Sequence, residues 1–199
     1  MALIHALTPG SWEEMHDIVQ MALEVGASLV QFHPLEWSGR AQNAFKSGLE
    51  EEELHRAYIM YHALEAEYGQ KIRIHMDIVH SDIAREEPVK VGMLPPAPIT
   101  DIQSLFNACR SLVLDDQGKL MPFSYGMHPD YHIGSLAGNS RQDVDAAFST
   151  YFKSGVAGFE ELLHSSYQSA IADDNDLLVW SDYVVSKSHS KSAGGVLAL

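Results

Sequence analysis

The sequence is poor in cysteine and in basic residues. Its 199 residues include one cysteine, Cys109, so no disulfide can form within the chain and a reducing compartment is expected. Lysine and arginine number 13 against 27 aspartate and glutamate residues, which gives a formal net charge of -14. Because no basic stripe is available to displace counterions from phosphates, we expect neither nucleic acid nor an anionic membrane surface as a partner.

Long apolar runs are missing as well. No run approaches the roughly 18 residues that span a bilayer, and the opening MALIHALTPGSWEE has neither the basic region nor the apolar core of a secretory signal. We therefore expect a soluble, cytoplasmic protein. Since 46% of the residues are hydrophobic, the chain can bury a core of roughly one domain, or of one domain with a small appendage.

The first half of the chain alternates between strand and helix patterns. Apolar runs predict strands over 3–7, 28–33 and 71–79. Between them, one helix is predicted from a capping box of Ser11 and Glu14 to Gly26, and another over 50–68. This order is typical of a parallel sheet with helices packed outside it. A closed (β/α)₈ barrel needs about 250 residues, so we expect a partial, half TIM-like α/β barrel over 1–98.

The second half predicts a smaller unit of a hairpin and helices. A short helix over 100–109 leads into a β-hairpin over 111–123, whose Asp-Asp-Gln-Gly turn places a glycine where positive φ is expected. Further helices are predicted over 143–152 and 159–172. We expect this appendage to occupy 99–186, and the polar tail 187–199 to be disordered.

Polar residues gather near the ends of the second and third predicted strands. His75 and Asp77 share one face of a strand, and His80 follows. Imidazole and carboxylate ligands suit Zn²⁺ or Fe²⁺, but no HxH or HExxH motif is present, and polar side chains at the end of a sheet explain the pattern more simply. In the loop after the second strand, Arg40 can pair with a ligand carboxylate or lie on the surface of a turn.

Two stretches resemble one family. LTPGSWEEMHDIVQMALEVGASLVQFHPLEWSGRA is similar to the second half of a radical S-adenosylmethionine (radical SAM) barrel, in which a strand, a helix ending in Gly-Ala or Gly-Val, and a strand running into a Gly-Arg loop recur in this order. CRSLVLDDQGKLMPFSYG, with the following HIGSL, resembles the SPASM/twitch extension of the same enzymes. In that extension a cysteine and a D-x-x-G-x-(V/L)-x-P-C hairpin bind an auxiliary iron–sulfur cluster. The resemblance covers roughly residues 2–170.

The resemblance implies cofactors and roles for particular residues. Full-length relatives use S-adenosylmethionine and a [4Fe–4S] cluster to modify peptides or small metabolites. By this likeness the strand around Gln31, Phe32 and His33 lies against the adenine of S-adenosylmethionine, and Arg40 approaches its carboxylate. His75 and Asp77 would face the substrate.

Two departures from the family pattern bear on function. The CxxxCxxC motif that holds the [4Fe–4S] cluster is absent, and Phe123 stands where the hairpin's second cysteine is expected. One thiolate cannot hold a cluster when four are normally required. We therefore interpret Cys109 as vestigial and expect the chain alone to bind neither cofactor.

Three hypotheses follow, and they leave open whether the chain is itself an enzyme. It is the C-terminal portion of a radical SAM/SPASM-like oxidoreductase, separated by truncation or gene splitting and without radical SAM activity of its own. Alternatively, it is a non-catalytic protein derived from that scaffold, which binds a small molecule or a peptide. The third hypothesis is a metal-dependent hydrolase that uses His75, Asp77 and His80. Because a half barrel has open sheet edges, we also expect a partner chain or a homodimer to complete the sheet.

Overall fold

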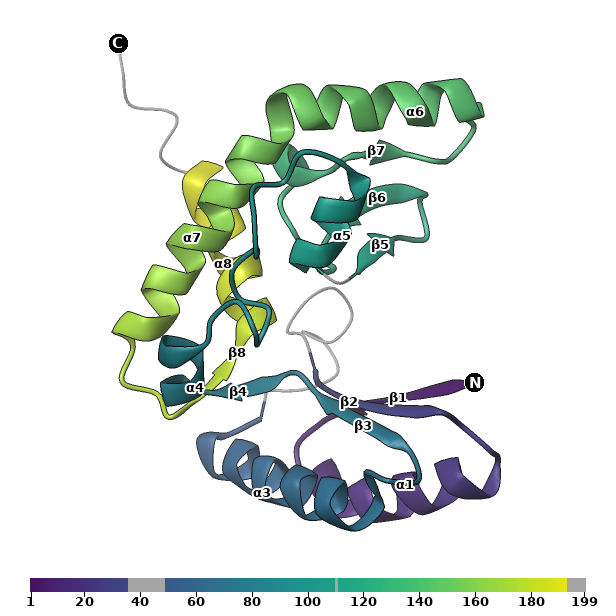
Figure 1. Cartoon of the computed structure of the whole chain (residues 1–199), viewed down its shortest axis with the longest axis vertical. Helices are drawn as coiled ribbons and strands as arrows, with labels where there is room; N and C mark the ends of the chain where they lie inside the picture. The colour runs from purple at the N-terminus through teal and green to yellow at the C-terminus, as the bar shows by residue number, and fades with distance from the viewer. Residues whose placement is uncertain (36–48, 110, 193–199) are drawn as a thin grey trace. The chain divides into compact units, whose positions relative to one another are not determined.

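The computed structural model describes residues 1–35, 49–109 and 111–192, and the chain divides into two compact units. Unit 1 comprises Met1–Val79 together with Leu177–Val179, and unit 2 comprises His80–Asp176 together with the chain from Trp180 onward (Figure 1). No helix in the described ranges is long and apolar enough to cross a membrane.

A three-stranded parallel sheet forms the centre of unit 1. Its strands, in spatial order, are β1 (Ala2–Leu7), β2 (Leu29–Pro34) and β3 (Arg73–Met76). β1 pairs with β2 without interruption, from Ala2 opposite Leu29 onward, and β2 pairs with β3 so that Gln31 lies opposite His75. The predicted mixed α/β fold with a parallel sheet is confirmed.

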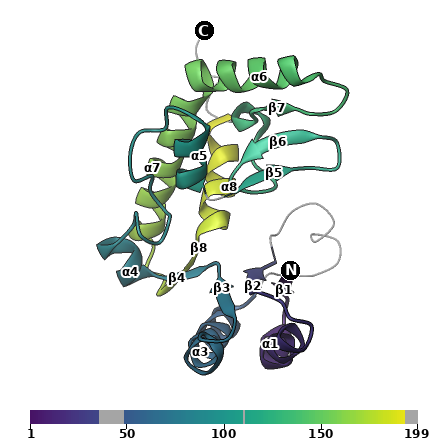
Figure 2. The ribbon, with the colours of Figure 1, turned by 45° about the vertical axis from the view of Figure 1, so that its right-hand side comes forward.

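Helices cover one face of this sheet, as Figures 1 and 2 show. They are the 3₁₀ turn η1 (Ser11–Glu14) with α1 (Met15–Glu24), and α3 (Glu51–Tyr68). Side chains alternate along each strand, so every second residue reaches the helices. The resulting core includes Val30, Phe32, Ile74 and Met76 from the sheet and Met15, Val19, Ala57 and Leu64 from the helices.

The ends of the first helical segment differ partly from the prediction. The Ser11 hydroxyl does not form a capping box, because it accepts from the Thr8 N–H at 2.7 Å and donates to the Thr8 carbonyl. At the other end Gly26 has φ of 69°, as a closing glycine should. The Gly26 N–H donates to the Leu23 carbonyl at 3.2 Å, and the Ala27 N–H donates to the Ala22 carbonyl at 2.8 Å. These two bonds form a Schellman motif.

The third predicted strand is divided in two by Asp77. β3 ends at Met76, and β4 (Ile78–His80) leaves the parallel sheet to pair with β8 (Leu177–Val179). The Asp77 N–H still donates to the Phe32 carbonyl at 3.3 Å, so the backbone of Asp77 remains bonded to β2.

Unit 2 combines a small antiparallel sheet with helices. The sheet consists of β5 (Leu112–Leu114), β6 (Lys119–Pro122) and β7 (Gly134–Ser135). The helical elements are α4 (Ser81–Glu86), α5 (Ile102–Cys109), η2 (Pro129–Tyr131), α6 (Arg141–Thr150), the π-helical turn η3 (Tyr151–Gly155), α7 (Val156–Ala172) and α8 (Trp180–Ser192). The predicted hairpin corresponds to β5 and β6, and the three predicted helices to α5, α6 and α7.

The unit boundary and the tail differ from the expectations of a division at 98 and disorder from 187. Residues 80–98 belong to unit 2, and two hydrogen bonds join the start of this segment to α7: Tyr167 donates to the Ala84 carbonyl, and Arg85 donates to the Ile171 carbonyl. Helix α8 continues through Ser192, because Lys187 donates to Ser169 and the buried Ser188 accepts from the His128 N–H. The rest of the predicted tail lies outside the described residues.

Candidate functional site

The face of the parallel sheet opposite α1 and α3 carries a row of polar side chains. No described element of unit 1 covers this face, and Ile4 on it is 72% exposed. Because alternate residues share a face and the strands are in parallel register, Gln31 and His33 of β2 lie there beside Arg73 and His75 of β3. The face is therefore apolar along β1 and polar along β3 and along β2 from Gln31 onward.

Asp77 brings three of these side chains together at the carboxyl end of the sheet. Its Oδ2 accepts from Gln31 Nε2 at 2.9 Å and lies 2.5 Å from His33 Nδ1. Its Oδ1 lies 3.3 Å from His75 Nδ1. We call Gln31, His33, His75 and Asp77 the Asp77 cluster; it is built by adjacent parallel strands whose odd-numbered residues point the same way.

The electrostatics of the Asp77 cluster favour an ionised carboxylate. Burial acts to raise the pKa of Asp77, but the hydrogen bond and charge of His33, then the charge of His75 and the amide of Gln31, outweigh it and hold the pKa below its usual range. An ionised carboxylate only accepts hydrogen bonds. The His33 Nδ1 that is hydrogen-bonded to Asp77 Oδ2 therefore carries a proton.

This arrangement can orient two imidazoles for proton transfer or ligand binding. The carboxylate on Nδ1 fixes the tautomer and the orientation of the His33 ring, and the His75 ring beside the same carboxylate can exchange a proton or a hydrogen bond with a ligand. The side chains of His33 and His75 are 29% and 45% exposed. A ligand on this face therefore has access to the His75 ring, the more exposed of the two.

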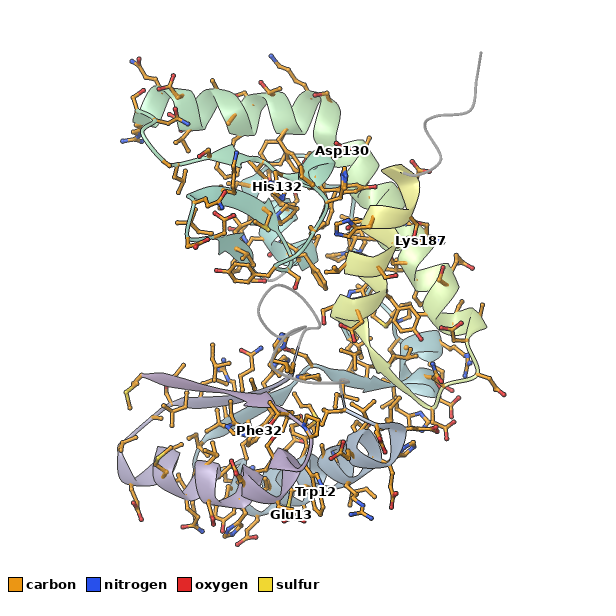
Figure 3. The ribbon with its side chains drawn as sticks, turned by 180° about the vertical axis from the view of Figure 1, so that it is seen from behind. Trp12, Glu13, Phe32, Asp130, His132 and Lys187 are labelled. Atoms are coloured by element: carbon orange, nitrogen blue, oxygen red, sulfur yellow. The ribbon has the colours of Figure 1, made fainter. Side chains whose placement is uncertain are left out.

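The other predicted site residues do not join the Asp77 cluster. Phe32 points to the helix-covered face (Figure 3), where it is fully buried. Its ring meets that of His5 edge-to-face at 6.1 Å. Only the backbone of Phe32 is therefore available to a ligand. His80 caps α4 by accepting from the Asp82 N–H. Arg40 lies outside the described residues.

A metal site is not evident where the structure is described. Residues 1–35, 49–109 and 111–192 contain no group of three or more histidine, cysteine, aspartate or glutamate side chains that could hold a metal ion. Within the Asp77 cluster, the carboxylate oxygens face the Gln31 amide and the Nδ1 atoms of His33 and His75.

The residues around Cys109 do not fit an iron–sulfur cluster. The thiol is buried and lies 3.1 Å from the Leu105 carbonyl and 3.0 Å from the Ser111 carbonyl, toward which it can donate. Burial raises the pKa of the Cys109 thiol, which disfavours the thiolate that binds iron. At the position of the expected second cysteine, the Phe123 ring meets Trp180 edge-to-face at 6.2 Å.

Sequence reasoning did not find Arg73 as part of the polar face. The signal was present in the alternation of Arg73, His75 and Asp77, which places three polar side chains on one side of a short strand. Nor did it find that one carboxylate joins β2 to β3, because that contact depends on strand register.

Comparison of the chain with protein-family models, with curated proteins and with solved structures found no match in any of the three. The geometry of the described residues is therefore the basis for assigning a function.

Proposed function

We propose that the chain is the C-terminal portion of a radical SAM enzyme with a SPASM/twitch-like extension, and that it forms a ligand-binding wall without radical chemistry of its own. The observation that supports this most directly is the Asp77 cluster on the uncovered face of a parallel sheet. The half TIM-like barrel and the SPASM-like identity of the β5–β6 hairpin are parts of the same proposal.

The position of the Asp77 cluster supports a binding role. In parallel α/β sheets, ligands bind beyond the carboxyl ends of the strands, which is where Asp77 follows β3. The cluster presents the partly exposed His75 ring, and Arg73 adds a cation on the same face, two residues before His75 at the start of β3. These groups suit a small polar molecule or a peptide with hydroxyl, amide or carboxylate groups.

The two cofactors of the family fit this chain unequally. Gln31 and His33 supply polar side chains that can contact S-adenosylmethionine on the uncovered face. S-adenosylmethionine supplies radical chemistry when a [4Fe–4S] cluster held by a CxxxCxxC motif reduces it, and this sequence has no such motif. Cys109, which the resemblance assigns to the auxiliary cluster, is buried and lies against two carbonyl oxygens. We therefore assign no reaction step to either group.

Calorimetric titration of the full chain tests the binding role, with S-adenosylmethionine and S-adenosylhomocysteine as the ligands. The sequence alone predicted that the chain binds neither cofactor, and the Asp77 cluster revises that expectation for S-adenosylmethionine, so we expect binding of at least one of the two ligands. The Kd should be at least tenfold weaker in Asp77→Asn, because the substitution removes the negative charge that faces the His33 and His75 imidazoles. Asp17→Asn is the control, because the Asp17 side chain is 90% exposed on α1. Absence of binding, or equal affinity in Asp77→Asn, contradicts the proposal.

A second candidate is a non-catalytic binding protein derived from the same scaffold. The packing of Phe123 on Trp180 and the buried, hydrogen-bonded Cys109 favour it, because they occupy the place of a metal site. The DNA upstream of Met1 discriminates between the two. An in-frame or adjacent CxxxCxxC motif supports the first candidate, and unrelated intergenic sequence supports the second.

A further inference from the structure

The outer edge of β1 is an unprotected strand edge. Within unit 1, no described strand pairs with it, and β1 pairs with β2 over six consecutive residues without a bulge. Natural proteins protect such edges with charges, prolines, bulges or short length. The segment Ala2–Leu7, ALIHAL, has none of these protections, although the whole chain carries a net charge of -14.

The direction of the backbone groups along β1 identifies the residues that are available for pairing. The Leu7 carbonyl accepts from the Leu35 N–H at 3.0 Å and so faces the β2 side. Because backbone groups alternate in direction along a strand, Leu3 and His5 also face β2. Ala2, Ile4 and Ala6 direct their N–H and C=O groups to the outer edge.

The three residues with outward backbone groups, Ala2, Ile4 and Ala6, form a palindromic sequence. Ala2 and Ala6 are equidistant from Ile4, so a second copy that approaches antiparallel about a two-fold axis at Ile4 places Ile4 opposite Ile4 and Ala2 opposite Ala6. Each pair is then of the hydrogen-bonded type, which gives about six backbone hydrogen bonds across the axis. The two Ile4 side chains, each 72% exposed in one chain, become neighbours on the same face of a continuous sheet.

We propose that two copies of this chain associate through antiparallel pairing of β1 with β1, centred on Ile4, to form one continuous six-stranded sheet. The inference does not rest on the Asp77 cluster or on the proposed function. It replaces the general expectation of a partner at an open edge with a specific strand, a direction and a register.

Sedimentation analysis of the full chain over a dilution series tests the association. We expect twice the chain mass for the wild type, and at least a tenfold higher dissociation constant for Ile4→Pro, because proline removes an outward N–H without removing a bond to β2. Far-UV circular dichroism verifies that the variant is folded. Ile59→Lys is the matched control: Ile59 is 68% exposed on α3, so dimerisation should be unchanged. A monomeric wild type, or a dimer unaffected by Ile4→Pro, overturns the proposal.

Cysteine cross-linking tests the register and remains decisive if Ile4→Pro does not fold. Opposed Ile4 residues have Cα atoms about 5.5 Å apart, within the range for a disulfide, so Ile4→Cys should form a covalent dimer on mild oxidation. Two Ala6 residues lie about 14 Å apart in this register, so Ala6→Cys alone should not cross-link, whereas a mixture of Ala2→Cys and Ala6→Cys chains should. The wild type controls for the buried Cys109. Equal cross-linking of Ala6→Cys and Ile4→Cys contradicts the register, and no cross-linking of Ile4→Cys contradicts the pairing.

Discussion

At Asp77 a single carboxylate accepts from an amide and lies against two imidazoles, and this has a consequence for stability at low pH. Because the pKa of Asp77 is lower in the folded chain than its ordinary value near 3.8, its contribution to stability is fully present above that value. The contribution is lost as the pH falls through the folded pKa. We expect Asp77→Asn to destabilise the chain by about 1–2 kcal/mol at neutral pH and the two stabilities to converge as the pH falls through the folded pKa of Asp77.

Urea denaturation of the wild type and Asp77→Asn between pH 2.5 and about 7 measures this effect. The Asp77 side chain is 25% exposed, whereas that of Asp17 is 90% exposed, so Asp17→Asn should follow the wild-type curve at every pH. Parallel curves for the wild type and Asp77→Asn would show that the hydrogen bonds to Asp77 do not depress its pKa.

Phe123 is strained in its backbone, with φ of 75°. The Ser124 N–H donates to the Pro122 carbonyl at 3.1 Å, which closes a three-residue γ-turn around Phe123. Left-handed backbone costs a residue with a Cβ about 1–2 kcal/mol, a cost that glycine avoids. We therefore expect Phe123→Gly to be more stable than Phe123→Ala by about 1 kcal/mol, although both lose the ring contact with Trp180.

Thermal or urea unfolding of both Phe123 variants isolates this backbone cost, because both lose the same ring. The control is the same pair at Val113, a β5 residue that is not among those with positive φ. There alanine should exceed glycine in stability, as is usual in a strand. If Phe123→Ala is also more stable than Phe123→Gly, the γ-turn is not strained.

At the scale of elements, the turn between β5 and β6 depends on the glycine that the sequence indicated. Gly118 has φ of 76°, and a Cβ added there would lie 2.8 Å from the backbone nitrogen of Ala137. Gly138 has φ of 71° but no atom within 4 Å of an added Cβ. We expect Gly138→Ala to cost about 1 kcal/mol from strain alone, and Gly118→Ala to cost about 1–3 kcal/mol more because the backbone must also shift.

Chemical denaturation of the two glycine variants checks this difference. The Leu136 N–H donates to the Gly118 carbonyl at 2.7 Å, so displacement of the turn in Gly118→Ala should also weaken the link from the hairpin to β7. Equal losses for Gly118→Ala and Gly138→Ala would mean that the contact with Ala137 relaxes without cost.

Elements with a local signal were predictable, and elements fixed by distant partners were not. The turn glycine Gly118, the closing glycine Gly26 and the apolar alternation of the strands lie within a few residues of the structure that they determine. The pairing of β4 with β8 joins segments about 100 residues apart, and no local pattern indicates it. Helix α8 has a polar sequence, and its stability comes from packed residues such as Val184.

For the whole molecule, the same distinction applies to the Asp77 cluster. His75 and Asp77 were predicted to share a face because two-residue spacing on a strand requires it. The bonds from Gln31 and His33 to Asp77 depend on the register of β2 against β3, which places Gln31 opposite His75. The composition of the chain, in contrast, is independent of its fold, and its single cysteine limits which clusters this chain can bind.

This limit predicts the outcome of anaerobic reconstitution with iron and sulfide. An iron–sulfur cluster normally requires four protein thiolates, and the whole chain offers Cys109 alone. Even a pair of chains supplies two thiols, each buried and directed at carbonyl oxygens. We expect no visible charge-transfer absorbance and no retained iron after desalting, and the same result for Cys109→Ser. Stoichiometric iron and sulfide in the wild type but not in Cys109→Ser would show that Cys109 leaves its buried site to bind a cluster, and would overturn its assignment as vestigial.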